Sequence, residues 1–196
     1  MASLLSLAFG IGLSAACGFR VFVPLLVLGL AARTGVLAVS PGFEWIGTDP
    51  ALVALGTATV LEVLAYFVPW LDHVLDALAT PTAVIAGILA SAAVLTDLPP
   101  VLRWGLAVIA GGGAAGLVQG ASVLVRLKST ALAGGLANPA VALVELAGSL
   151  LTALLAVALP LLAVALVLAL CILAFRVAGR VLFGRRRAAG GSGSAP

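Results

Sequence analysis

Long runs of apolar residues, separated by short polar stretches, cover most of the chain. The runs are continuous and rich in Leu, Ala and Val, whereas strands of a membrane barrel alternate polar and apolar residues. Because about 20 apolar residues cross the core of a bilayer, these runs predict membrane-spanning helices. The expected apolar segments are residues 2–33, 51–68, 81–95, 102–125, 138–159 and 160–176.

The connections between the runs contain turn-forming or polar residues. Gly and Pro cluster in residues 34–50, which predicts a loop, and two prolines end the turn at 97–100. Residues 69–80 contain Asp and His side chains and predict a polar connector before the third span. The glycines at 111–113 permit either close helix packing or a break in the fourth span.

The first run is too long for one upright span, and it is interrupted by a charged residue. Arg20 lies in its middle, between Gly18 and Pro24. This pattern predicts either a tilted, kinked helix or a broken, re-entrant pair of helices, and both interpretations stay open at this point.

Two parts of the chain match each other at a constant shift in numbering. The shift pairs Arg20 with Arg126 and Gly29-Leu-Ala31 with Gly135-Leu-Ala137, and a further pairing with an insertion sets Glu62 against Glu145. Inverted repeats of three helices, in residues 2–97 and 101–183, would explain the match. Such repeats recur in secondary transporters, whose binding sites lie at broken helices. Coincidence in a sequence rich in Ala and Leu is the alternative.

The composition supports a lipid environment. Hydrophobic residues make up 63% of the chain and charged residues 9%, against roughly 45–50% and about 25% in soluble proteins. So few charges could not cover a water-exposed surface. We therefore expect an all-α, polytopic transmembrane bundle of about six spans in a single domain, residues 1–184. Residues 185–196 are expected to form a flexible basic and Gly/Ser-rich tail.

The net charge of +3 is concentrated after the last apolar run. The basic residues there are Arg176, Arg180, Arg185, Arg186 and Arg187. Under the positive-inside rule this cluster predicts a cytoplasmic C-terminus in the inner (plasma) membrane. A nucleic-acid partner is not expected, because the cluster adjoins a membrane segment and has little aromatic interleaving. The lipid bilayer is the expected partner, and homo-oligomerisation is left open.

Charged residues inside apolar runs are the candidate functional residues, because each costs at least about 2.5–3.5 kcal/mol on insertion scales. Four residues meet this criterion: Arg20, Glu62, Arg126 and Glu145. Their expected polar neighbours are Gln119, Tyr66 and Asn138. One hypothesis is a small transporter or lipid-handling protein, whose arginines hold an anionic or amphiphilic substrate while the glutamates balance charge or accept protons. The other is a non-transporting structural or partner subunit, in which the four residues only neutralise each other.

Other chemistry has little support in the sequence. Asp72, His73 and Asp76 could bind a cation, but the two aspartates serve equally well at the start of the third helix. Cys17 and Cys171 lie in apolar runs without disulfide or zinc-site spacing. No catalytic motif is present, so we expect neither an enzyme nor a cofactor.

The chain also resembles a known bacterial family. The opening AFGIGLSAACGFRVFVPLLVLGLAARTG, the middle LEVLAYFVPWLDHVLDALATPTAVIAG and the later GGLANPAVALVELAGSLLTALLAVALP look like the family catalogued as domain of unknown function 4126, DUF4126. The likeness covers most of residues 8–165. The resemblance implies a multi-pass membrane protein and carries no established activity.

Overall fold

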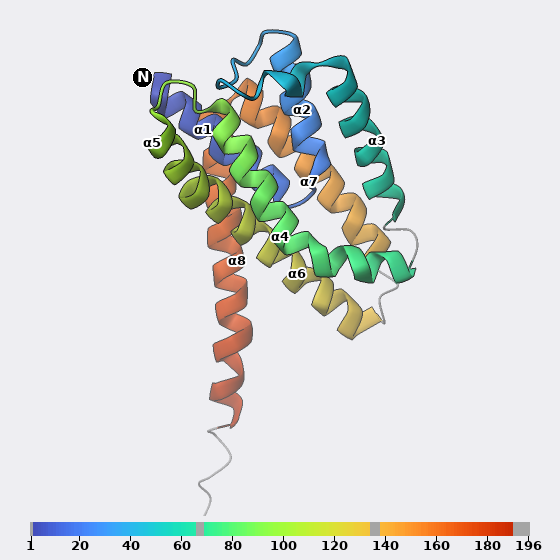
Figure 1. The fold of residues 1–196 in the computed structure, drawn as a ribbon. Coiled ribbons are helices and arrows are strands. Elements are labelled where there is room, and N and C mark those ends of the chain that lie inside the picture. Colours follow the sequence, from blue (N-terminus) through green and yellow to red (C-terminus); the bar gives the residue numbers. More distant parts are fainter. Residues whose placement is uncertain (1, 66–68, 134–137, 190–196) are drawn as a thin grey trace, which may run out of the picture.

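The computed structural model describes residues 2–65, 69–133 and 138–189, and every regular element in these ranges is helical. This confirms the prediction of an all-α chain. In chain order the elements are α1 (Ala2–Cys17), α2 (Phe22–Arg33), a short 3-10 helix η1 (Glu44–Gly47), α3 (Asp49–Ala65), α4 (Pro69–Val94), α5 (Pro100–Leu106), a π-helical segment η2 (Ala107–Gly112), α6 (Gly113–Ala133), α7 (Asn138–Ala158) and α8 (Pro160–Ala189) (Figure 1).

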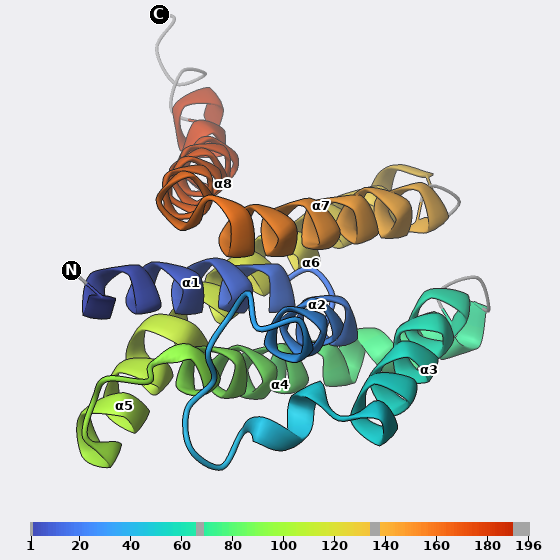
Figure 2. The same ribbon diagram turned by 90° about the horizontal axis from the view of Figure 1, so that it is seen from above.

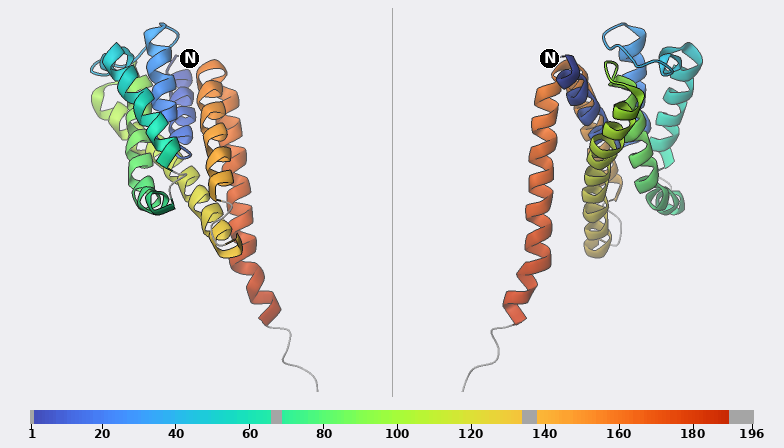
Figure 3. Two further views of the ribbon diagram at one scale, coloured as in Figure 1. Left: turned by 90° about the vertical axis from the view of Figure 1, so that its right-hand side faces the viewer. Right: turned by 60° about the vertical axis from the view of Figure 1, so that its left-hand side comes forward.

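Helix α1 lies at the centre of the bundle. It contacts α2, α4, α6, α7 and α8, and the view from above places it between α7 and α4 (Figure 2). Helix α3 lies at the edge, where it packs on α2, η1 and α4, and Leu55 is the buried residue of this helix. Helix α8 projects beyond the other helices (Figures 1 and 3). It continues to Ala189 and so includes the first residues of the predicted tail.

The first apolar run is broken into two helices, which excludes the interpretation as one kinked helix. α1 ends at Cys17, the chain reverses, and α2 returns toward the end of the molecule where α1 began (Figures 1 and 3). A Cβ on Gly18 would lie 2.6 Å from the Ala115 carbonyl oxygen, so only glycine allows α6 to approach this closely. Pro24 falls in the first turn of α2, where backbone N–H groups have no helical partner and its missing donor is tolerated.

The predicted polar connector at residues 69–80 is wrong, because these residues form the first turns of α4. Pro81 then lies inside the helix. Its ring and missing N–H disrupt the local hydrogen bonding, which explains why the first turns run at an angle to the rest (Figure 1). The predicted third span, residues 81–95, corresponds to the second part of α4.

Elements α5, η2 and α6 follow one another without a break, and small residues pack their middle against α4 and α1. A Cβ on Gly111 would lie 2.7 Å from the Gly87 carbonyl oxygen. The same oxygen accepts a 2.6 Å hydrogen bond from Ser14 Oγ. Gly111 and Gly112 thus allow close helix packing, whereas a Cβ on Gly113 would meet nothing within 4 Å. The predicted alternative of a break is replaced by a π-helical segment.

The loop between α2 and α3 closes one end of the bundle. Ser40 donates from its backbone N–H to Ala93 O (2.6 Å) and from Oγ to Ala92 O (3.0 Å). These carbonyls lie in the last turn of α4 and lack helical donors, so the loop satisfies them. Phe43 also contacts Trp104 of α5, with 6.2 Å between ring centroids. These contacts anchor the loop. The prediction of a loop over residues 34–50 is confirmed except that it contains η1 and that α3 already begins at Asp49.

Two of the described helices are long and apolar enough to cross a membrane by length and composition. They cover Pro100–Leu127, with 28 residues, and Pro139–Ala158, with 20. Shorter apolar helices cover Leu4–Cys17, Phe22–Arg33, Leu78–Val94 and Pro160–Leu173. A bundle of six full spans is therefore not confirmed. The break divides the first apolar run into two shorter helices, and this is one physical reason for the difference.

The predicted inverted repeat finds no support at the residues that suggested it. Arg20 lies in the break between α1 and α2, whereas Arg126 lies inside α6, which is helical from Gly113 to Ala133. The two arginines therefore have different backbone surroundings despite the matching sequence around them.

We expect Gly87→Ala to destabilise the protein, whereas Gly120→Ala should not. The new methyl group at residue 87 would lie 2.5 Å from Ala115 Cβ, while nothing lies within 4 Å at residue 120. Overpacking should lower the free energy of unfolding by about 1–3 kcal/mol. The control replaces glycine in an open part of a helix and should be neutral or slightly stabilising. Denaturant unfolding in detergent, followed by circular dichroism, measures both, and equal effects would contradict the close packing.

Candidate functional site

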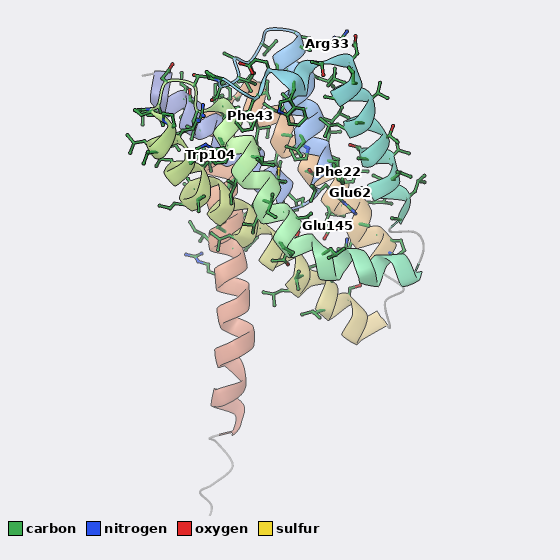
Figure 4. All side chains as sticks on the ribbon, viewed as in Figure 1. Phe22, Arg33, Phe43, Glu62, Trp104 and Glu145 are labelled. Atoms are coloured by element: carbon green, nitrogen blue, oxygen red, sulfur yellow. The ribbon has the colours of Figure 1, made fainter. Side chains whose placement is uncertain are left out.

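Four ionisable residues from four parts of the chain meet inside the bundle. Arg20 comes from the break, Glu62 from α3, Arg126 from α6 and Glu145 from α7. Arg20, Arg126 and Glu145 are buried, with 2%, 6% and 5% of their surface exposed, and Glu62 is partly buried. Figure 4 shows Glu62 and Glu145 close to the start of α2, about half way along the bundle. We call these four residues the charged cluster.

Glu145 is the centre of the charged cluster. Its Oε1 accepts hydrogen bonds from Arg126 Nε (3.0 Å) and Ser122 Oγ, and its Oε2 accepts one from Arg126 Nη2. The pair with Arg126 is therefore bidentate, the geometry that best matches a guanidinium to a carboxylate. Ser122 and Arg126 are one helical turn apart on α6, so a single face of this helix holds the carboxylate.

Arg20 also lies close to Glu145. Its Nη2 lies 3.5 Å from Glu145 Oε2 and donates a 2.9 Å hydrogen bond to the Ala142 carbonyl oxygen. Residue 20 can reach α7 because the chain leaves the helix at Gly18 and turns through the interior. Ser149 of α7 supports the same segment, since its Oγ donates to Ala16 O (3.0 Å) in the last turn of α1.

Glu62 binds the N-terminus of α2. Its Oε1 accepts a 2.9 Å hydrogen bond from the backbone N–H of Val21, and its Oε2 accepts a 3.2 Å bond from that of Phe22. The side chain of Val21 makes no capping bond, so a carboxylate from another helix serves as the cap. The N-terminus of a helix favours such negative charge. Glu62 also interacts electrostatically with Arg20 and Glu145.

Among the remaining predicted site residues, the structure describes the side chain of Gln119 alone. Gln119 is buried on α6, on the same helical face as Ser122 and Arg126. Asn138 begins α7, but its side chain lies outside the described part, and Tyr66 lies outside it altogether. The side chains of the weak metal candidates, Asp72, His73 and Asp76, are also outside it. The described residues contain no group of three or more His, Cys, Asp or Glu that could hold a metal ion.

Sequence reasoning identified the charged residues but missed two features of their surroundings. The capping of α2 by Glu62 depends on how α3 packs on α2, and no pattern within either helix indicates that packing. The bond from Arg20 to the Ala142 carbonyl is equally non-local. By contrast, Gln119 is one of the predicted polar neighbours, and it does lie on the α6 face that carries Arg126.

The charged cluster places cationic groups around two carboxylates. Two guanidinium groups and one helix N-terminus, all cationic in character, converge on two carboxylates supplied by the protein itself. An external anion could bind to these donors by replacing a carboxylate. The carboxylates could equally accept protons. The arrangement contains no paired nucleophile and base among the described residues.

Comparison with known proteins identifies a family. A family model described as "Domain of unknown function (DUF4126)" matches residues 7–180. No curated protein and no solved structure matches the chain.

We expect Glu145→Gln to destabilise the protein by about 3–5 kcal/mol, because it leaves two buried guanidinium groups without their shared carboxylate. The double variant Arg126→Gln/Glu145→Gln should recover most of this loss, since it removes charges of both signs. Glu44→Gln, at an exposed carboxylate, should change the free energy of unfolding by less than about 0.5 kcal/mol. Denaturant unfolding in detergent measures all three. A double variant less stable than Glu145→Gln alone would show that the buried pair is not the cause.

Proposed function

We propose that this chain, which belongs to the DUF4126 family, is an integral membrane protein that binds an anionic or amphiphilic substrate at the charged cluster and moves it across the membrane. The observation that carries the proposal is the position of two buried arginines and a helix N-terminus at a break inside the bundle. Secondary transporters place half-helix N-termini at anionic substrate groups in this way.

The outer surface of the bundle supports a membrane location. Large apolar side chains are exposed along its helices, among them Val53, Leu61, Ile109, Val144 and Leu161, each more than half exposed. Lipid is the solvent that suits such a surface, since soluble proteins rarely expose contiguous apolar area on this scale. We take residues 1–184 as a single transmembrane domain.

The helix directions give the proposed topology. α1 and α2 enter and leave at the same end, while α3, α4, the α5–η2–α6 run, α7 and α8 each pass from one end to the other (Figures 1 and 3). The start of α1 and the end of α8 then lie on opposite sides of the membrane. The basic end of α8 is on the cytoplasmic side under the positive-inside rule, which suits a multi-pass inner-membrane protein.

The anion would exchange with the protein's own carboxylates. Arg20 and Arg126 share Glu145, so a substrate anion that binds between them releases this side chain. A released glutamate in an apolar interior favours its protonated form, which gives Glu62 and Glu145 a role as proton acceptors during transport.

The alternative is a structural or partner subunit whose charged cluster only fixes the helix packing. The observation in its favour is the bidentate bond between Arg126 and Glu145, which occupies both carboxylate oxygens. Under this alternative, the wild-type protein carries no anion flux, and neutralising the pair together changes only its stability.

The topology is tested with single cysteines in a variant that carries Cys17→Ala and Cys171→Ala. Ala38→Cys lies in the exposed loop at one end, and Ala188→Cys lies near the end of α8. An impermeant thiol reagent should label residue 38 in intact cells or spheroplasts and residue 188 only after permeabilisation. Labelling of both positions from the same side would overturn the topology.

The function is tested by flux through proteoliposomes loaded separately with lactate, laurate, phosphate or chloride. We expect wild-type protein to pass at least one of these anions, and Arg20→Ala and Arg126→Ala to abolish its flux. Arg126→Gln/Glu145→Gln should also lose flux while remaining folded, which separates transport from packing. Arg33→Ala, at an exposed ion pair with Asp49, is the matched control and should transport normally. Absence of flux in wild type, or flux unaffected by the cluster variants, would overturn the proposal.

A further inference from the structure

The two halves of α3 are attached to the bundle differently. The helix lies at the edge and packs mainly on α2 (Figure 2). In its first half Leu55 is buried, and a Cβ on Gly29 of α2 would lie 2.8 Å from Leu52 Cδ2. In its second half, residues 56–65, all of which the structure describes, no residue is buried. Packing therefore holds the first half of α3 much more firmly than the second.

Polar contacts join each half of α3 to α2. Glu62, in the second half, accepts hydrogen bonds of 2.9 Å and 3.2 Å from the backbone N–H groups of Val21 and Phe22. A charged acceptor makes such bonds roughly twice as strong as a neutral one. The first half has a contact of its own, the exposed ion pair between Arg33 and Asp49. Loss of the charge on Glu62 therefore weakens the attachment of the second half and leaves that of the first half intact.

The junction between the two halves is a place where the helix can bend. Gly56 lies there, and a Cβ at this position would meet nothing within 4 Å, so close packing does not explain the glycine. Thr57 Oγ1 donates a 2.8 Å hydrogen bond to Val53 O. Thr59 Oγ1 donates a bond of 2.8 Å to Leu55 O. Glycine weakens a helix and bonds of this kind often bend one, so the junction has the properties of a hinge.

The second half of α3 separates the break from the lipid. Its inner side faces the break, because Glu62 binds the two residues that follow Arg20 (Figure 4). Its outer side exposes Leu61 and Leu64, at 60% and 56%. Arg20 has 2% of its surface exposed. A tilt of the second half away from α2 would therefore open a path between the lipid and the charged cluster.

We propose that the second half of α3 is a side gate to the charged cluster, hinged at Gly56 and held shut by the charge of Glu62. The inference rests on the proposed function, which makes Glu62 a proton acceptor during transport. Protonation of Glu62 opens the gate toward the lipid, and the return of its charge closes it.

Other ionisable groups surround Glu62. Arg20 from the break, Glu145 from α7 and Cys17 from α1 interact with it electrostatically. The charged residues of α2 and η1 lie at the other end of α3. Helix α4 also contacts α3, and the titratable side chains of its first turns lie outside the described part: Asp72, His73 and Asp76. A response to pH is therefore assigned to Glu62 only where Glu62→Gln removes it.

The test measures distances between spin labels on the full chain in nanodiscs, in the variant that carries Cys17→Ala and Cys171→Ala. The gate pair places labels at Leu64→Cys and Leu151→Cys, and so joins the second half of α3 to α7. The control pair joins the first half to α7 through Val53→Cys and Leu151→Cys. All three labelled positions are more than half exposed.

Glu62→Gln should lengthen the distance of the gate pair by about 4 Å and leave the control pair unchanged. This is the displacement of a helical segment of about 12 Å that tilts by about 20°. Glu44→Gln, at an exposed carboxylate, is the matched control and should behave as wild type. In wild type the gate pair should lengthen in the same way as the pH falls, which covers the case in which Glu62→Gln fails to fold.

The hinge is tested by stiffening the helix without adding a clash. Gly56→Ala should reduce the population with the longer distance in the Glu62→Gln background, because alanine favours the straight helix. Gly120→Ala, at an equally open position in α6, is the control and should not change that population.

A gate-pair distance that is the same in wild type at every pH and in Glu62→Gln would overturn the gate. Equal lengthening of both pairs would also overturn it, because α3 would then move as a whole. Movement of the gate pair without anion flux through proteoliposomes would support the gate and contradict the proposed transport. Flux without this movement would support transport and contradict the gate.

Discussion

The arrangement of helices in the interior of the protein depends on the bonds that the Glu145 carboxylate makes. This carboxylate joins α7 to α6 through Arg126 and Ser122, and to the break between α1 and α2 through Arg20. Removing charge from water is costly, so these residues are stable in an apolar bundle only when they meet each other. Their pairing therefore fixes the relative positions of three segments that are far apart in the sequence.

The break in the first apolar run requires the same kind of compensation. A chain that reverses inside the bundle exposes N–H and carbonyl groups that neither water nor lipid can satisfy there. Glu62 binds the first N–H groups of α2, and Ser149 donates to a carbonyl at the end of α1. Side chains that make the break possible thus also bring two carboxylates beside two guanidinium groups. The break that requires these side chains is therefore also the place where the proposed anion site lies.

The sequence predicted the features that depend on the residues of a single segment. It did not predict the features that depend on how one helix packs against another. Apolar runs predicted the helices, and the cost of intramembrane charge singled out Arg20, Arg126 and Glu145, which the structure brings together. The sequence did not predict the helical first turns of α4, because polar residues before Pro81 are equally typical of a connector and of a helix. The capping role of Glu62 was missed because it depends on the contact between α3 and α2, which has no signature in either helix.

A crystal structure of the protein grown with 2-bromopropionate tests the central claim most directly, since the compound carries a carboxylate and its bromine can be located by anomalous scattering. If the charged cluster is an anion site, a bromine peak should lie beside Arg20 and Arg126, and the ligand carboxylate should bind the two guanidinium groups with Glu145 displaced. A structure in which Glu145 still binds both arginines, with no bromine peak inside the bundle, would contradict the claim.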